Sequence, residues 1–477
     1  MNIKKNFVYS IILTSSQYIF PLLIFPYITR ILGVANIGKV EYVDSIISYF
    51  VLFASMGINI LGIREIAKSN GDQEKLNNVF SSLLSLNFLT TSLFGLIFFI
   101  VIFFIGDTGD YKKLLLIGSA KLLFSFILIE WLYKGLENFK LITIRTFFVK
   151  TLYSISVFVF IKEPEDYELF WQLTVLMVVA NGIINFIYSK KYVHFSLNSI
   201  NLRSYIRPNF ELGFYLFLTS MYTTFNVFFL GFKSNDTEVG FYSTAIKIYG
   251  VLLGIYTAFS TVMLPRMSSL IENKNDEKFR WYINFSFNLL TKVSIPLVFF
   301  SVSLASIIIQ IIAGKGFEGS ILPLQIILPL IFVVGCAQIF SLQVLMPLKK
   351  DSSVLRASFI GSVIGVVLNL ILVKYLHSIG SALVLIISEV SVTLILYHFA
   401  KKHFVLNFTF IEFIKNLAIG LPVIGIALLS KWFISSPLLI LIVAFSGTVC
   451  YLFIAYYYVF KDQFAVSVID RFIINRR

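Results

Sequence analysis

The strongest candidates for chemistry in this 477-residue chain are five ionisable residues within long apolar stretches: Lys121, Glu130, Lys247, Lys292 and Glu389. A charged side chain at the centre of a bilayer costs about 2.5–3.5 kcal/mol, so such residues normally face a wet cavity or an opposite charge. Ammonium groups around one cavity could neutralise a molecule that carries phosphate. The same lysines could instead extend towards the membrane surface or pair with carboxylates for packing, and the sequence leaves both interpretations open.

An internal repeat places further charged residues in corresponding positions. Residues Tyr42 to Tyr49 and Tyr242 to Tyr249 both read Tyr-x3-Ile-x2-Tyr, and each is followed by an apolar stretch that ends at an arginine, Arg64 or Arg266. Repeats of this kind inside a membrane protein are typical of transporters, whose substrate sites lie at the interface between the repeats. Two more charged residues, Arg30 and Asp44, flank the outer ends of the first two apolar stretches.

Other kinds of chemistry find no support in the sequence. The two cysteines, Cys336 and Cys450, lie in apolar stretches, and the four histidines are scattered, so we expect no disulfide framework, metal site or cofactor. The chain contains no phosphate-binding loop and no nucleophile elbow. We therefore expect a protein that is not an enzyme and does not hydrolyse ATP, and that draws on a gradient of an ion such as H⁺ or Na⁺, a substrate gradient or a partner.

The composition indicates the elements that must position these residues. Hydrophobic residues make up 58% of the chain and charged residues 13%, compared with about 25% charged residues in soluble domains. Apolar runs of about 20 residues are long enough to cross a bilayer. The sequence predicts an all-α polytopic membrane protein with about 14 transmembrane helices, at residues 8–32, 38–62, 79–105, 112–133, 141–161, 168–188, 210–231, 240–264, 283–312, 321–346, 355–375, 378–399, 412–432 and 436–460.

The repeat divides these spans into three parts. We predict an N-terminal six-helix bundle in residues 1–205, a C-terminal six-helix bundle in residues 206–405, and two additional helices with a cytoplasmic tail in residues 406–477. Because the offset of six spans is even, the two bundles should enter the membrane in the same sense, as pseudo-symmetric halves.

The basic residues predict the orientation in the membrane. Most of the 39 Lys and Arg residues fall in alternate loops and at both termini, which predicts cytoplasmic termini by the positive-inside rule. The net charge of +14 therefore indicates topology and contact with membrane lipids. We expect no nucleic-acid partner, because the aromatic residues are not interleaved with basic residues on a polar surface.

Four sequence motifs resemble those of a known family. The chain is similar to the Wzx-type flippases of O-antigen and other polysaccharides, which belong to the multidrug/oligosaccharidyl-lipid/polysaccharide exporter superfamily, over about residues 5–400. The motifs that carry the resemblance are Gln17-Tyr18-Ile19-x-Pro21-x4-Pro26-Tyr27-x-Thr29-Arg30-x-Leu32-Gly33, Trp131-x2-Lys134-Gly135-Leu136-Glu137, Tyr242-Ser243-Thr244-Ala245-x-Lys247 and Leu264-Pro265-Arg266.

This resemblance implies a fold and an activity. The fold would be two six-helix bundles arranged as a V around a central cationic cavity. The activity would be translocation of an oligosaccharide linked to undecaprenyl pyrophosphate, from the cytoplasmic to the periplasmic face of the bacterial inner membrane, for O-antigen or surface polysaccharide biosynthesis. The basic residues in matching motifs are Arg30, Lys247 and Arg266, with Arg64 as the repeat-related partner of Arg266. Together with the residues within spans, the candidate cavity residues are Arg30, Asp44, Arg64, Lys121, Lys247, Arg266, Lys292 and Glu389.

Two alternative functions remain open. A cation-coupled drug or small-molecule antiporter of the same superfamily would favour an acidic cavity, whereas the spans of this chain hold more lysine than carboxylate. A membrane-embedded polysaccharide polymerase would need a large outer loop for its catalytic residues, and the outer loops are short.

Overall fold

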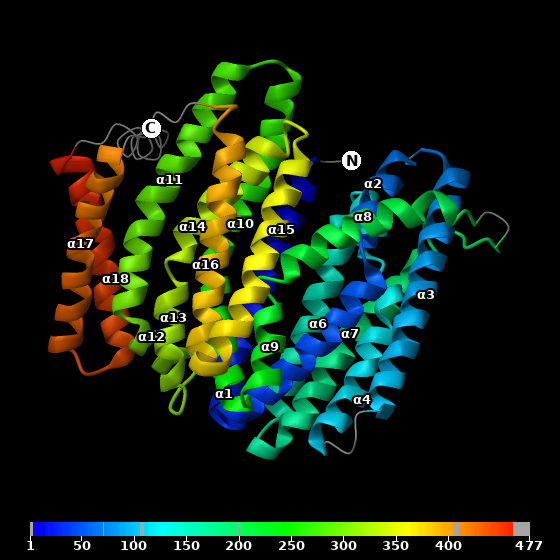
Figure 1. The fold of residues 1–477 in the computed structure, drawn as a ribbon, viewed down its shortest axis with the longest axis horizontal. Coiled ribbons are helices and arrows are strands. Elements are labelled where there is room, and N and C mark those ends of the chain that lie inside the picture. Colours follow the sequence, from blue (N-terminus) through cyan, green and yellow to red (C-terminus); the bar gives the residue numbers. More distant parts are fainter. Residues whose placement is uncertain (1–2, 70, 105–108, 198–199, 405–409, 461–477) are drawn as a thin grey trace. The chain divides into compact units, whose positions relative to one another are not determined.

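The protein is helical throughout the part of the chain that its computed structural model describes, which is residues 3–69, 71–104, 109–197, 200–404 and 410–460 (Figure 1). The predicted all-α membrane fold is therefore confirmed for these residues. The cytoplasmic tail that the sequence predicts beyond residue 460 lies outside the described residues.

The chain forms two compact units, and the first comprises Met1–Ser243 and Asn369–His377. The helical segment α1 (Ile3–Ser55), which kinks at Gly33, packs against α3, α4 and α6 and organises this unit. The elements of the first unit are α1, α2 (Ile58–Lys68), α3 (Gln73–Phe104), α4 (Asp110–Leu123), η1 (Ser125–Ile127), α5 (Glu130–Gly135), α6 (Phe139–Phe160), η2 (Pro164–Asp166), α7 (Tyr167–Ser189), α8 (Arg203–Ser220), α9 (Phe225–Lys233), the first turns of α10 (Asp236–Glu272) and η6 (Asn369–Val373).

The second unit comprises Thr244–Leu368 and Ser378–Arg477. Its most extensive helix pairing is between α11 and α17, and α17 packs in turn against α18. The elements are the rest of α10, α11 (Asp276–Ser303), α12 (Ala305–Ile312), η4 (Glu318–Ser320), α13 (Ile321–Ile327), α14 (Leu330–Gln338), η5 (Ile339–Leu345), α15 (Asp351–Leu368), α16 (Lys374–Ala400) from Ser378 onward, α17 (Phe410–Phe433), α18 (Pro437–Phe453) and η7 (Ile454–Val459). The sequence analysis divides the chain into two repeats at residues 205/206. This division into repeats is distinct from the two compact units, and it stays a prediction.

The structure has ten helices long and apolar enough to cross a membrane among the described residues, or up to twelve if each bent pair is one span. Two of these stretches, Ile19–Lys68 and Asp351–Ala400, are 50 residues long, and each covers two predicted spans. A straight helix of that length would measure about 75 Å, more than twice the hydrocarbon thickness of about 30 Å. The backbone leaves the helical conformation within them at Gly33 (φ 75°, ψ 170°) and His377 (φ 47°, ψ −123°). Both breaks fall between predicted spans, and the count of fourteen stays a prediction.

One predicted span, 112–133, is a broken helix. Helix α4 ends at Leu123, a short 3₁₀ turn follows, and α5 begins at Glu130. Broken helices in membrane proteins are tolerated where the freed backbone groups are buried in protein or line a wet cavity. The break places Glu130, one of the ionisable residues identified in the sequence, at a half-buried position at the start of α5.

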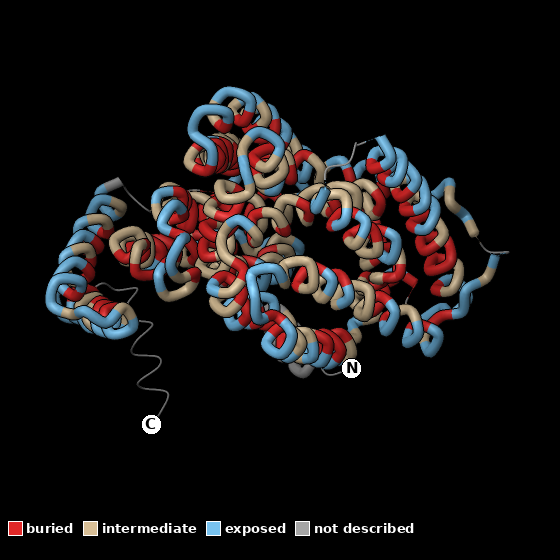
Figure 2. Tube along the Cα trace, turned by 90° about the horizontal axis from the view of Figure 1, so that it is seen from below, coloured by how far each residue is buried: buried red, intermediate tan, exposed pale blue. Residues whose placement is uncertain are grey.

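Glycines let the helices of the first unit approach closely. A Cβ atom on Gly62 of α2 would lie 2.6 Å from the ring of Trp131, and one on Gly135 of α5 would lie 2.7 Å from the side chain of Ile66. Trp131 is only 2% exposed and belongs to a buried apolar cluster shared by α2, α3 and α5. The motif that contains Trp131 and Gly135 thus has a packing role. Elsewhere, many helices carry exposed residues along one side, as lipid-facing helices do (Figure 2).

Candidate functional site

The first unit contains an ion pair between two helices, formed by Asp44 of α1 and Lys121 of α4. The Lys121 ammonium donates a hydrogen bond to Asp44 Oδ1, and the two side chains are 19% and 35% exposed for Lys121 and Asp44, respectively. Gly118 lies one turn before Lys121, and a Cβ atom there would be 2.8 Å from Ile47. The absence of a side chain at Gly118 brings α4 close enough to α1 for the pair to form. Of the eight candidate cavity residues, the structure brings these two into direct contact.

A second charged cluster surrounds the break between α4 and α5. Glu130 Oε1 accepts a hydrogen bond from Arg145 Nη2 at 2.7 Å, and Glu130 Oε2 lies 3.1 Å from Lys134 Nζ. The other terminal nitrogen of Arg145 donates to the amide oxygen of Asn185 on α7. The Arg145 side chain is 5% exposed, so its charge depends on these partners. Further along α6, Lys150 donates to the backbone oxygen of Ser16 at 3.1 Å.

Arg145 and Lys150 are interior groups that the sequence pattern does not indicate. Both lie near the start of the predicted span 141–161, where basic residues usually mark the cytoplasmic end of a helix. In the structure both lie inside α6, five residues apart, on a helix that begins at Phe139. The available signal was the regular spacing of Lys140, Arg145 and Lys150 within an otherwise apolar stretch.

The two candidate arginines of the first unit lie at exposed positions. Arg30 on α1 donates to the backbone oxygen of Pro26, one turn earlier. Arg64 on α2 has a 63% exposed side chain and lies 3.6 Å from Glu65 Oε1. Neither arginine takes part in the Asp44–Lys121 pair.

The remaining four candidates lie in the second unit. Lys247 of α10, Lys292 of α11 and Glu389 of α16 are half-buried, and Lys292 donates to Asn288 Oδ1 at 3.4 Å. The Arg266 guanidinium is exposed and stacks on the ring of Tyr282, 4.3 Å from its centroid. Their assignment to a shared cavity stays a prediction.

The repeated tyrosines have structural contacts. Tyr42 and Tyr49 are seven residues apart, which places them on one face of α1, and both rings contact Phe228 of α9. Tyr49 also donates to the backbone oxygen of Ser220 at 3.1 Å. In the second copy, Tyr242 is fully buried and its hydroxyl accepts a hydrogen bond from Asn226 at 3.1 Å. The sequence repeat therefore marks helix-packing positions around α9.

We expect the Asp44–Lys121 pair to stabilise the first unit. Asp44→Ala and Lys121→Ala should each lower the thermal stability of the purified protein in detergent, because each leaves one charge without its partner. The double variant should lose less than the sum of the two, with a coupling energy of about 1–2 kcal/mol, as for other contacting pairs. The exposed pair Arg207–Glu211, with side chains 88% and 62% exposed, is the matched control. Its coupling energy should be only about 0.3–0.5 kcal/mol. If the double variant lost as much stability as the two single variants together, the Asp44–Lys121 pair would not stabilise the first unit.

Two family models match the chain, each over more than half of its length. The model described as "Polysaccharide biosynthesis protein" matches residues 3–271. The model described as "Lipid II flippase MurJ" matches residues 206–468. The two matches overlap across α8, α9 and most of α10.

Individual proteins are similar to this chain in sequence, and solved structures are similar to it in fold. The chain is 25% identical over 423 residues to a protein of Escherichia coli (strain K12) named "Putative O-antigen transporter", covering 84% of this chain and 98% of that protein. It is 22% identical to "Capsular polysaccharide biosynthesis protein CapF" of Staphylococcus aureus, covering 84% and 100%. Its fold is similar to that of lipid II flippase MurJ in an inward closed conformation, with a TM-score of 0.76, 16% identity and coverage of 94% and 99%. An inward-facing multidrug transporter of the MATE family is also similar, with a TM-score of 0.59, 15% identity and coverage of 81% and 94%.

Proposed function

Because this chain belongs to the polysaccharide biosynthesis protein family, among the Wzx-type flippases of the multidrug/oligosaccharidyl-lipid/polysaccharide exporter superfamily, we propose that it flips a lipid-linked oligosaccharide across the bacterial inner membrane. The substrate is an oligosaccharide repeat unit on undecaprenyl pyrophosphate, and it moves from the cytoplasmic to the periplasmic face. The observation that carries this proposal is the family match over residues 3–271, supported by relatives whose full lengths the chain covers almost completely.

The charge of the candidate residues fits an anionic substrate. A pyrophosphate that crosses a medium of low dielectric constant needs cationic partners, because its loss of hydration is otherwise prohibitive. Lys247, assisted by Arg30, Lys121 and Lys292, supplies these charges. Lysine suits this role because it is a flexible point charge that can pass a phosphate group onward. Lys121 is paired with Asp44, so it acts on the substrate only when that pair opens.

The drug-antiporter alternative is less well supported by the interior of the first unit. Buried Arg145 and half-buried Lys121, Lys134 and Lys150 accompany the carboxylates there. A cavity that selects organic cations would place unpaired carboxylates in the interior, whereas Asp44 and Glu130 are both in ion pairs.

Transport by the purified full-length protein in proteoliposomes tests the proposal. The probe is the undecaprenyl-pyrophosphate-linked repeat unit from the bacterium that produces the protein, incorporated into the vesicles. A membrane-impermeant reagent that modifies sugars detects the probe once it reaches the opposite leaflet. We expect transfer well above that of protein-free vesicles, and the assay is run both with and without a proton or sodium gradient to identify what drives it. Ethidium movement without movement of the lipid-linked probe would instead support the antiporter, and elongation of the glycan in the same vesicles would support the polymerase.

A further inference from the structure

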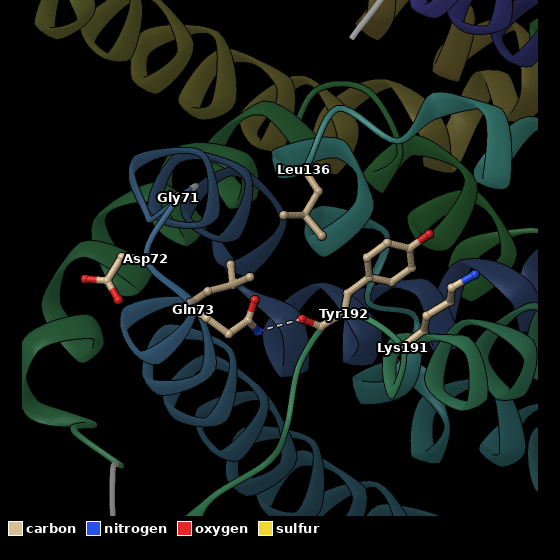
Figure 3. A pocket seen from close by; sticks show the side chains of 7 residues that line it. Gly71, Asp72, Gln73, Leu136, Lys191 and Tyr192 are labelled. Carbon is tan, nitrogen blue, oxygen red and sulfur yellow. Dashed lines mark hydrogen bonds between the residues drawn. The ribbon is translucent and has the colours of Figure 1, made fainter.

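A pocket of about 310 Å³ lies in the first unit, where three loops that are distant in sequence meet (Figure 3). Gly71 and Asp72 come from the connection between α2 and α3, and Gln73 begins α3. Leu136 comes from the turn between α5 and α6, and Tyr192 from the segment after α7. The volume is at the lower end of the range of about 300–1,000 Å³ for small-molecule sites. It suits a small ligand, such as one or two sugar rings.

The pocket walls are held in place by hydrogen bonds. Gln73 Nε2 donates to the backbone oxygen of Tyr192 at 2.8 Å and to Asn77 Oδ1 at 3.2 Å. The hydroxyl of Tyr192 accepts from Asn138 Nδ2 at 2.8 Å, and the Tyr192 ring contacts the ring of Tyr133 edge-on. Figure 3 shows the Leu136 side chain directed between Gln73 and Tyr192. A ligand would therefore meet a preformed site and would lose little affinity to ordering of side chains.

Unused hydrogen-bonding groups at the pocket indicate the chemistry of the ligand. Both hydrogens of the Gln73 amide are donated, while its oxygen accepts no hydrogen bond from the described residues. Asp72 Oδ1 caps α3 by accepting from the Lys75 backbone at 3.0 Å, and Asp72 Oδ2 has no partner among the described residues. These two acceptor oxygens suit hydroxyl donors. The Lys191 ammonium lies over the ring of Tyr188, 5.8 Å from its centroid, and supplies a donor at the rim.

A sugar fits this lining better than a phosphate does. Acceptors for hydroxyl groups, beside Leu136 and the ring of Tyr192, match the polar edge and the apolar face of a pyranose. A pyrophosphate would meet the Asp72 carboxylate and would be repelled. The loops that form the pocket are also among those that the distribution of basic residues predicts to be cytoplasmic, where a lipid-linked sugar is available before transport.

We propose that this pocket binds the carbohydrate part of the substrate at the cytoplasmic face, before the substrate enters the transport route. This inference rests on the proposed function, because that function supplies a glycan on this side of the membrane. The pocket would select which repeat units enter, through hydroxyl contacts with Asp72 and Gln73. Because Asp72 and Gln73 are both exposed, water can replace a missing sugar hydroxyl, so we expect this selection to be modest.

Binding of the free oligosaccharide to the full-length protein in nanodiscs tests the proposal. The probe is the repeat unit released by mild acid from the lipid-linked intermediate of the host, titrated by calorimetry. We expect Gln73→Ala to weaken binding about tenfold, because it removes an acceptor and a wall support. Leu136→Trp should abolish binding by filling the pocket. Lys190→Ala, at an exposed neighbouring position outside the pocket, is the matched control and should bind like the unmodified protein.

The outcomes separate this inference from the proposed function. If the proteoliposomes transport the lipid-linked probe but the free oligosaccharide does not bind, the pocket assignment is wrong and the proposed function stands. Equal binding by Leu136→Trp and Lys190→Ala, or displacement of the oligosaccharide by inorganic pyrophosphate, would also overturn the pocket assignment. If the oligosaccharide binds as expected while no transport occurs, the proposed function fails and the glycan site remains.

Discussion

Replacing Lys247 with alanine should strongly reduce the export of surface polysaccharide while the protein is still inserted at normal levels. A charge-assisted hydrogen bond is worth about 1.5–3 kcal/mol, which corresponds to a loss of roughly 10- to 150-fold in affinity or rate. The loss should be large because a pyrophosphate in a low-dielectric interior has no water to replace the missing cation. Surface polysaccharide is measured in a deletion strain complemented with each variant, with the protein quantified in isolated membranes.

Two further variants test whether export requires the positive charge at position 247. One keeps the charge there, and the other removes a lysine elsewhere in the chain. Lys247→Arg keeps the charge and should retain partial export, because the planar guanidinium cannot fully replace a compact ammonium. Lys374→Ala removes an exposed lysine from another span of the chain and should leave export unchanged. Full surface polysaccharide with Lys247→Ala would show that the cationic role assigned to this residue is wrong.

The sequence predicted the helical fold well because hydropathy and span length are local properties. The predicted spans are mostly helical where the structure describes them, although the span 112–133 is broken. The two 50-residue stretches break at Gly33 and His377, where the sequence places loops. Charge partners were harder to predict, because a pair such as Asp44–Lys121 joins residues 77 positions apart. The sequence pattern places Lys121 within a span and Asp44 near the end of another span. Only the packing of α4 on α1 shows that the two residues form an ion pair.

The candidate site could be predicted only in part, for a related reason. The sequence does not indicate that Arg145 is buried, because a charged residue near a span end can lie either inside the protein or at the membrane surface. Its burial follows from contacts with Glu130 and Asn185, which come from two other helices. The sugar pocket was not predicted at all. It consists of three loop segments, and loops carry no periodic pattern that would indicate which of them meet.

A close crossing of two helices within the first unit leads to the second prediction. A Cβ atom on Gly38 of α1 would lie 1.7 Å from the backbone oxygen of Asp236 and 2.7 Å from the backbone nitrogen of Gly240, at the start of α10. A Cβ atom on Gly240 would in turn lie 2.3 Å from the backbone oxygen of Val34. The atoms in the way belong to the backbone, so they cannot turn aside as a flexible side chain would. Any substitution must push the two helices apart.

Gly38→Ala and Gly240→Ala should each destabilise the protein by about 1–3 kcal/mol, as overpacking does in other well-packed interiors. Each should also lower polysaccharide export at least about tenfold, because α1 and α10 carry the two copies of the repeat, and transporters with repeats work by moving one repeat against the other. Thermal unfolding in detergent and surface polysaccharide in the complemented deletion strain measure the two effects.

Gly250 provides the matched control, since it lies further along α10 and a Cβ atom there would meet nothing within 4 Å. Gly250→Ala should preserve export and should stabilise the helix slightly, by about 0.5–1 kcal/mol, since alanine favours helix over glycine. The double variant Gly38→Ala/Gly240→Ala should lose less than the sum of the single losses, because the first methyl group already separates the helices that the second would force apart. Normal stability and export with Gly38→Ala would show that α1 and α10 do not need this close approach. Additive losses in the double variant would show that the two glycines act at independent sites and not at one crossing.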